Sequence, residues 1–200
     1  MIIAIAVTTA LVLIIIGFWL FFHRDPERAS PASASYLSPA DGIVTSITKT
    51  KENKQLIEKG SHGITAFLED FPRASIIIVI TMNLWHVHTQ RAPVTGIIKQ
   101  LVHKPGKHMN AVNNKEGKAT TENEHLGITI AGKKPCKVYL IAGLMARRIK
   151  PLVTRGEHVE QGQKIGKIRM GSQVALVLPN TKVTVKKGDR VYAGISEIAR

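Results

Sequence analysis

The chain has 200 residues and a formal net charge of +14, from 28 Lys and Arg against 14 Asp and Glu. This length suffices for one compact domain with its own core and leaves little for a second. A single cysteine, Cys136, excludes an internal disulfide and a cysteine-based zinc site, in agreement with a reducing compartment. The charge favours an anionic phospholipid membrane as a partner. Sparse aromatics and the lack of an Arg-rich recognition helix argue against nucleic acid.

Residues 1–22 carry no charge and predict a transmembrane anchor. At 1.5 Å per residue, the run spans roughly 30 Å, the thickness of a bilayer's hydrocarbon core. Trp19 fits an interfacial aromatic, and His23 and Arg24 fit a charged stop. Lys and Arg follow the run and do not precede it, so the positive-inside rule predicts a domain on the cytoplasmic side of the cell membrane. The alternative, a cleaved signal peptide, would need a basic segment before a shorter apolar run.

Residues 23–38, rich in Pro, Ala and Ser, predict a linker, and residues 39–200 a single domain. Short Val- and Ile-rich runs bounded by turn residues predict strands in this domain. No long stretch after residue 25 has a helical period, so helices should be few and short. The runs are too continuous for strands with one exposed face, which predicts a mainly β fold, a sandwich or barrel of short strands. The runs are Ile43–Ile47, Ser75–Thr81, Gly96–Val102, Val138–Ala142 and Val174–Leu178.

Two sequence patterns occur twice. The segment 39–44 has an echo at 93–98, and the segment 155–162 recurs 32 residues later. In each copy of the second pattern, a glycine turn leads into a β-branched strand and a further glycine turn. This pattern resembles the barrel-sandwich hairpins of biotinyl and lipoyl carrier domains. We therefore expect a duplicated hairpin unit within the fold.

The dipeptide Gly171-Ser172 lies at a predicted tight turn between two strands. Glycine permits strained backbone angles there, which would let the serine hydroxyl approach the preceding carbonyl. A Gly-Ser dipeptide alone carries little information, since Gly60-Ser61 is a second one. An ordinary hairpin turn is the alternative interpretation.

Three further side chains are candidates for chemistry. His86 and His88 would face the same way on a strand, because their spacing is two. Such a pair could ligate zinc, but packing or surface hydrogen bonding is the commoner use, and we expect no metal. Asp41 lies in a Pro-Ala-Asp-Gly turn before a strand, which is also typical of a structural turn residue.

These motifs, taken together and in order, resemble the short, archaeal-type phosphatidylserine decarboxylases over about residues 36–179. The most specific part runs from residue 142 to residue 172. The matching motifs are Pro39-Ala40-Asp41-Gly42, His88-x-x-Arg91-x-Pro93-x-x-Gly96, Asn123-Glu124, the segment 141–149, and Gly162-Gln163-x-Ile165-Gly166-x-Ile168-Arg169-x-Gly171-Ser172.

The resemblance implies a proenzyme that makes its own cofactor. Ser172 Oγ would attack the carbonyl of Gly171 to give an ester; β-elimination of that ester and hydrolysis of the elimination product would leave a pyruvoyl group on the fragment 172–200. The family uses an Asp–His pair to activate this serine, which by motif position is Asp41 and His88.

The resemblance also implies the reaction. The pyruvoyl group would form a Schiff base with phosphatidylserine and serve as an electron sink, giving phosphatidylethanolamine and CO₂. His88 would reprotonate the α-carbon. The fragments 1–171 and 172–200 would stay associated. Archaetidylserine is an alternative substrate, because the chemistry concerns only the headgroup.

The sequence departs from the family pattern at three positions. Long members have a second histidine where this chain has Arg91, and an arginine cannot shuttle protons at neutral pH. His88 must then do both jobs, unless His86 or Arg91 supports it. His125 replaces an arginine of the family, and Met170 stands where an aromatic is usual.

Two other functions share parts of the pattern. A LytM-type zinc peptidase has a similar hairpin and an H-x-H motif, but there the motif follows the hairpin. A biotinyl- or lipoyl-type carrier would need an exposed lysine at the hairpin tip, where this chain has Gly171-Ser172. Denaturing gel mobility separates the three hypotheses, because only the decarboxylase predicts a chain split near residue 171.

Overall fold

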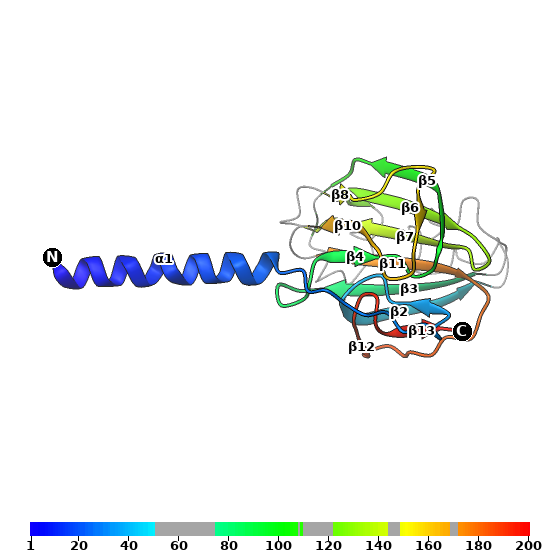
Figure 1. The fold of residues 1–200 in the computed structure, drawn as a ribbon, viewed down its shortest axis with the longest axis horizontal. Coiled ribbons are helices and arrows are strands. Elements are labelled where there is room, and N and C mark those ends of the chain that lie inside the picture. The colour runs from blue at the N-terminus through cyan, green and yellow to red at the C-terminus, as the bar shows by residue number, and fades with distance from the viewer. Residues whose placement is uncertain (51–74, 108, 110–121, 144–148, 169–171) are drawn as a thin grey trace.

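The computed structural model of the protein places a mostly β domain at the end of one long helix (Figure 1). It describes residues 1–50, 75–107, 109, 122–143, 149–168 and 172–200. The helix, α1 (Ile2–His23), projects from the domain, and Phe22 is its one buried residue. With 22 residues, α1 is long and apolar enough to cross a membrane.

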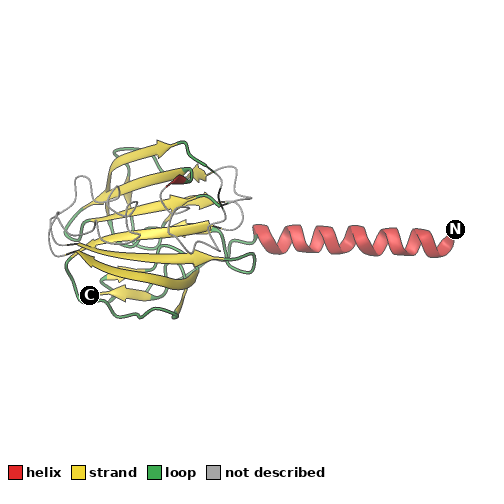
Figure 2. Ribbon diagram, turned by 180° about the vertical axis from the view of Figure 1, so that it is seen from behind, coloured by secondary structure: helices red, strands yellow, loops and turns green. Residues whose placement is uncertain are grey.

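The described strands form three antiparallel sheets, the largest of which curls into a half-barrel (Figures 1 and 2). In spatial order, its eight strands are β12 (Arg190–Val191), β2 (Gly42–Thr50), β3 (Ser75–Met82), β11 (Ser172–Pro179), β7 (Cys136–Ile141), β6 (His125–Ala131), β5 (Gly96–Lys104) and β9 (His158–Val159). The second sheet holds β4 (Thr89–Arg91), β10 (Lys164–Ile168) and β8 (Ile149–Pro151), and the third pairs β1 (Tyr36–Leu37) with β13 (Glu197–Ala199). The mainly β prediction is confirmed, and the five predicted runs coincide with β2, β3, β5, β7 and β11.

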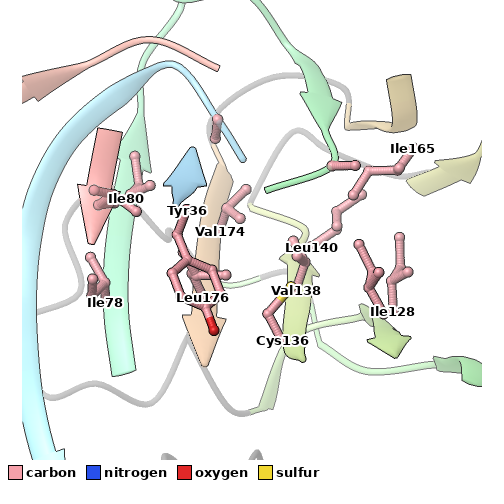
Figure 3. Packing of buried hydrophobic residues seen from close by; sticks show 14 of the residues in the cluster. Tyr36, Ile78, Ile80, Ile128, Cys136, Val138, Leu140, Ile165, Val174 and Leu176 are labelled. Carbon is pink, nitrogen blue, oxygen red and sulfur yellow. The ribbon is translucent and has the colours of Figure 1, made fainter. Parts of the chain in front are cut away.

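The central strands β3 and β11 are buried on both faces, as their continuous apolar runs predict. They pair across eight positions, from Ser172 opposite Met82 to Pro179 opposite Ser75. Since side chains alternate along a strand, half of each strand enters the main core and the other half a second cluster on the opposite face. Figure 3 shows the main core, where Tyr36 of β1 and Ile165 of β10 meet side chains of the large sheet. The two small sheets therefore contribute to the same core as the large one.

The sequence repeats fold into equivalent strand pairs, which confirms the predicted duplication. Gly42 at the start of β2 lies opposite Val191 of β12, and Gly96 at the start of β5 lies opposite Val159 of β9. Both long strands carry a register shift at the same distance from that glycine. The turns before β12 and β9 each hold a glycine with positive φ, a conformation that other residues rarely adopt. These glycines are Gly188 (φ +97°) and Gly156 (φ +88°).

The segment 24–35, between α1 and β1, contains neither helix nor strand and lies against the domain. The ammonium of Lys164 lies 3.0 Å from the carboxylate of Asp25. Further along, Ser30 Oγ donates a hydrogen bond to the carbonyl of Gly194 at 2.8 Å. These contacts fix where α1 meets the domain.

Candidate active site

The residues that the motifs single out lie at one end of the large sheet, where β2 and β11 begin and β3 ends. We call this end of the strands the edge of the sheet. Ser172 begins β11 opposite Met82, the last residue of β3. Asp41 immediately precedes β2, and His88 immediately precedes β4. Because neighbouring strands are antiparallel, the start of β2, the end of β3 and the start of β11 share this edge. Helix α1 meets the domain on the same side (Figure 1).

Short contacts connect the His88 segment to Ser172. The side-chain amide of Gln90 donates to the His88 carbonyl at 3.0 Å and lies 3.7 Å from the sulfur of Met82. The hydroxyl of Ser172 lies 3.6 Å from the same sulfur. The backbone N–H of Ile168 also donates to the His88 carbonyl, at 3.1 Å. The structure thus brings His88 and Ser172 to one edge without a hydrogen bond between them.

Ser172 is fully buried, and its hydroxyl lacks a strong hydrogen-bond acceptor among the described residues. Its one described partner is the Met82 thioether, which accepts hydrogen bonds weakly. A hydroxyl held this loosely can turn toward another acceptor at little cost. Gly171, the other half of the predicted cleavage bond, lies outside the described residues.

His88 is buried as a neutral imidazole. It is 1% exposed, and neither ring nitrogen has a hydrogen-bond partner in the described part of the chain. The centroid of its ring lies 4.7 Å from the ring centroid of Phe22, in the last turn of α1. Burial, helped by the charges of His86, Arg24 and Lys167, lowers the pKa of His88 to about 4, and the nearby backbone of His86 acts in the opposite direction. A neutral, unpaired imidazole has one nitrogen free to accept a proton from a hydroxyl.

Acidification is expected to destabilise the fold through His88. Its folded-state pKa of about 4 lies below the ordinary 6.5, so between these values the unfolded chain binds the proton more tightly. His88 thus contributes stability at neutral pH that is lost as the pH falls from 6.5 to 4, in total about 3 kcal/mol. Unfolding of an uncleaved Ser172→Ala chain in detergent should show this loss.

The control for this prediction removes one imidazole at a time. His88→Gln should reduce the acid loss, whereas His158→Gln, at an exposed position, should leave it unchanged. An acid loss of the same size with and without the His88 imidazole would contradict its burial in the neutral form.

Asp41 is buried and ion-paired with Arg28, which lies in the segment predicted as a linker. Arg28 donates from both terminal nitrogens, to Oδ1 at 2.5 Å and to Oδ2 at 2.9 Å. The hydrogen bond to Asp41 raises the pKa of Arg28. Oδ1 also accepts from the backbone N–H of Ala193 at 2.8 Å. Within the described residues, no hydrogen bond joins Asp41 to His88, so the Asp–His pair that the resemblance implies remains a prediction.

The duplicated fold offers a structural comparison for Asp41. Thr95 is the corresponding residue of the other copy, and its hydroxyl accepts from the backbone N–H of Gln161 at 3.0 Å. This bond corresponds to the one from Ala193 to Asp41. A threonine therefore suffices for the turn, and the second carboxylate oxygen of Asp41 is the feature that the turn does not require.

His86 packs beside this edge and is also buried. Its Nδ1 accepts from the backbone N–H of Asn83 at 3.0 Å, so the neutral ring carries its proton on Nε2. Burial and then Arg190 lower the pKa of His86, whereas the charge of Asp41 acts in the opposite direction.

Arg91 stands at the position where long family members have a histidine, and it forms hydrogen bonds with three separate backbone segments. Its guanidinium donates to the carbonyls of Gly162 at 2.9 Å and Pro26 at 3.1 Å. Its own N–H donates to the carbonyl of Pro39, at the turn that carries Asp41, at 2.9 Å. Through these bonds Arg91 connects the backbone at Gly162, Pro26 and Pro39.

The Asn123-Glu124 motif likewise organises the backbone beside β7. Asn123 accepts from the N–H of Met109 and donates to the carbonyls of Met109 and Ala142, all at 2.7–2.8 Å. The carbonyl of Glu124 accepts from the N–H of Ala142 at 2.9 Å. Within the described residues, no three His, Cys, Asp or Glu side chains gather to hold a metal ion.

Two residues at this edge escaped the sequence analysis. Phe22 belongs to a helix that is apolar all round, so no pattern distinguishes the one side chain that packs on His88. Arg28 lies in a polar, proline-containing stretch, and its partner follows 13 residues later. Neither contact has a local sequence signal, because both depend on how the linker crosses the folded domain.

A serine hydroxyl and a neutral imidazole are the groups that enzymes with a serine nucleophile pair, and here both lie at one end of the large sheet, with no hydrogen bond between them among the described residues. The sequence model of the phosphatidylserine decarboxylase family matches residues 15–199. The chain belongs to this family of carboxy-lyases. Membership decides against the zinc peptidase and the carrier domain.

Individual relatives agree with the family match. A phosphatidylserine decarboxylase proenzyme of Erythrobacter litoralis is 38% identical over 185 residues, which cover 90% of this chain and 72% of that protein. One of Nitrosomonas europaea is 38% identical over 186 residues, covering 88% and 77%. A protein of Methanocaldococcus jannaschii, provisionally named archaetidylserine decarboxylase proenzyme, is 36% identical over 185 residues, covering 91% and 89%.

Proposed function

We propose that the chain is a proenzyme of a phosphatidylserine decarboxylase, which converts phosphatidylserine to phosphatidylethanolamine and CO₂. Self-cleavage between Gly171 and Ser172 would give fragments 1–171 and 172–200. The observation that carries the proposal is the fully buried Ser172 hydroxyl, at the start of a central strand and at the same edge as the unpaired imidazole of His88. Family membership and the proenzyme names of the relatives support it.

In this scheme, His88 accepts the proton of the Ser172 hydroxyl as that oxygen attacks the carbonyl of Gly171. The neutral state of the buried imidazole supports this role, since a protonated ring could not act as a base. Asp41 would stabilise the imidazolium once its contact with Arg28 loosens. The nitrogen of Ser172 takes this proton as its bond to the Gly171 carbonyl carbon breaks, so that an ester forms and His88 returns to its neutral state.

The fragment 172–200 would remain bound after cleavage, because its strands belong to the eight-stranded and the two-stranded sheets. β11 lies between β3 and β7, β12 pairs with β2, and β13 pairs with β1. Removing it would expose the apolar residues of a central strand. We therefore propose 1–22 as anchor, 23–38 as linker and 39–200 as a decarboxylase domain made of two associated chains.

The surroundings of residue 172 fit a pyruvoyl group. The position is buried and borders the uncharged Met82 thioether, so a small neutral carbonyl group would be accommodated without an unpaired charge. A pyruvoyl group supplies a carbonyl that condenses with an amine and then accepts the electron pair released with CO₂. The chain's own contribution would be to exclude water there and to place the His88 imidazole where it could relay a proton to the substrate carbon.

The apolar helix α1 supports a membrane as the place of the reaction. The positive-inside rule favours the cytoplasmic side for the domain, since the basic residues all follow α1. Archaetidylserine remains the second candidate substrate. It shares the serine headgroup, and a relative bears that name.

The proposal is tested with purified full-length protein in detergent. We expect intact-mass spectrometry to find two chains, and CO₂ to be released from phosphatidylserine labelled in the serine carboxyl group. Phenylhydrazine, a carbonyl reagent, should abolish the activity by modifying only the smaller chain. An uncleaved chain that still releases CO₂ would refute the cofactor. Parallel assays with archaetidylserine identify the preferred lipid.

A further inference from the structure

We propose that the turn between β3 and β4, residues 83–87, is a second membrane contact. Leu84 and Trp85 at its tip insert into the interface of the same bilayer that α1 crosses. The insertion holds the sheet edge that carries Ser172 and His88 against the lipid surface.

The turn is built to present two apolar side chains outward. Asn83 fixes its shape: its side-chain oxygen accepts from the N–H of Trp85 at 3.0 Å, and its carbonyl accepts from the N–H of His86 at 3.1 Å. Trp85 is 63% exposed and Leu84 38% exposed. A large indole held in water by an ordered turn is a feature that a membrane interface would explain, because tryptophan is enriched there.

Direct contacts attach this turn to the end of the anchor. The ring centroid of Phe21, in the last turn of α1, lies 5.8 Å from that of Trp85, and the two rings pack edge to face. Arg24 donates from its guanidinium to the carbonyl of Trp85. Phe22 packs on His88, which follows the turn in the chain. Since the end of α1 lies at the membrane interface once the helix spans, Trp85 must lie at about the same depth.

The basic residues near the turn favour an anionic lipid surface as the partner. Arg24 and Lys167 are close enough to lower the pKa of His88, and Arg190 and Arg24 that of His86. Each basic residue near an anionic surface contributes about 1 kcal/mol of attraction. An apolar tip whose backbone is bonded to the basic residue Arg24 suits the interface of an anionic bilayer. Insertion of the turn would place residue 172 where a lipid headgroup could reach it while the acyl chains stay in the bilayer.

Fluorescence tests the insertion without any need for enzymatic activity. The chain has two tryptophans, Trp19 and Trp85, so Trp19→Phe leaves Trp85 as the sole reporter. In vesicles of phosphatidylcholine and phosphatidylglycerol, its emission should shift to the blue and be quenched by lipids brominated near the headgroup end of the acyl chain. Trp85→Phe, which leaves Trp19, checks that the anchor is inserted.

Each outcome of this test decides the proposal. Emission typical of water, without quenching, would overturn it. A blue shift without bromolipid quenching would overturn it too, because the indole would then be covered by protein, such as a second copy of the chain. An unquenched Trp19 would show that α1 does not enter the bilayer, and the proposal would fall with it.

Kinetics test the consequence for the proposed reaction. Trp85→Ser should raise the apparent KM for phosphatidylserine in vesicles about tenfold, equivalent to about 1.4 kcal/mol, and leave self-cleavage and turnover of a water-soluble short-chain phosphatidylserine unchanged. The matched control is Ile97→Ser, which removes a 51% exposed side chain from the start of β5, at the end of the sheet away from Ser172. Equal effects of the two variants on vesicle KM, or an equal loss on the soluble substrate with Trp85→Ser, would refute a lipid contact.

Discussion

Ser172→Ala is expected to give a single uncleaved chain without decarboxylase activity, because no hydroxyl remains to attack the carbonyl of Gly171. The loss should be complete, since both the cleavage and the proposed cofactor derive from this one side chain. The fold should survive, because the lost hydroxyl has only a weak contact with the Met82 sulfur. We expect a stability change of no more than about 1 kcal/mol. Denaturing electrophoresis and intact mass check the cleavage, and thermal unfolding checks the fold.

The second Gly-Ser of the chain provides the control. Ser61→Ala removes the same hydroxyl from the dipeptide Gly60-Ser61 and should leave cleavage and turnover unchanged. The identity of the cut is tested by the mass of the smaller chain, which must correspond to residues 172–200. A Ser172→Ala chain that still splits at this point would show that another group performs the cleavage.

The strands were predictable because their apolar character is local. Uninterrupted Val and Ile, as in Ile76–Ile80, have few stable environments other than a strand buried on both faces. The duplication was also visible in the sequence, because both copies need a glycine at the start of the long strand. A side chain at Gly42 or Gly96 would collide with the backbone of the neighbouring strand. By contrast, β4 and β8 are three residues each and are defined by their pairing with β10. Pairing between distant segments leaves no periodic signal in such short runs.

The candidate site was predictable only in part. The motifs identified Ser172, His88 and Asp41, and topology explains why they reach one edge, since each stands at the end of a strand. The contacts at that edge were not predictable, because they come from the anchor and the linker. Composition makes α1 apolar on every side and the linker polar, and neither property indicates that Phe22 covers His88 or that Arg28 binds Asp41.

The largest effect after that of Ser172 is expected at His88, whose loss should stop both self-cleavage and turnover. His88→Ala removes the only unpaired, neutral imidazole described at the edge. Asp41 should matter differently, through its charge during self-cleavage. Asp41→Thr is the informative change, because Thr95 forms the same turn in the other copy of the repeat. This variant should still form the turn and should cleave itself at least about 10²-fold more slowly, the scale of a lost acid–base partner.

Asp41→Thr also leaves Arg28 without its partner, so the loss of the ion pair needs its own control. The double variant Arg28→Gln/Asp41→Thr removes the buried cation together with the carboxylate. If the carboxylate itself assists cleavage, the double variant should be as slow as Asp41→Thr. Recovery of the normal rate in the double variant would show instead that the unpaired arginine, and not the missing carboxylate, impairs the site.

Turnover is separated from maturation by supplying residues 172–200 as a synthetic chain that already carries the pyruvoyl terminus. It is folded together with residues 1–171 bearing either mutation, which bypasses self-cleavage. The Asp41→Thr enzyme should then retain substantial activity, because no serine hydroxyl remains to be activated. The His88→Ala enzyme should remain inactive, since the proton for the substrate carbon is still missing. Equal collapse of both would show that Asp41 also acts in turnover. Full activity without His88 would point to His86, whose Nε2 carries a proton because Nδ1 is occupied by Asn83.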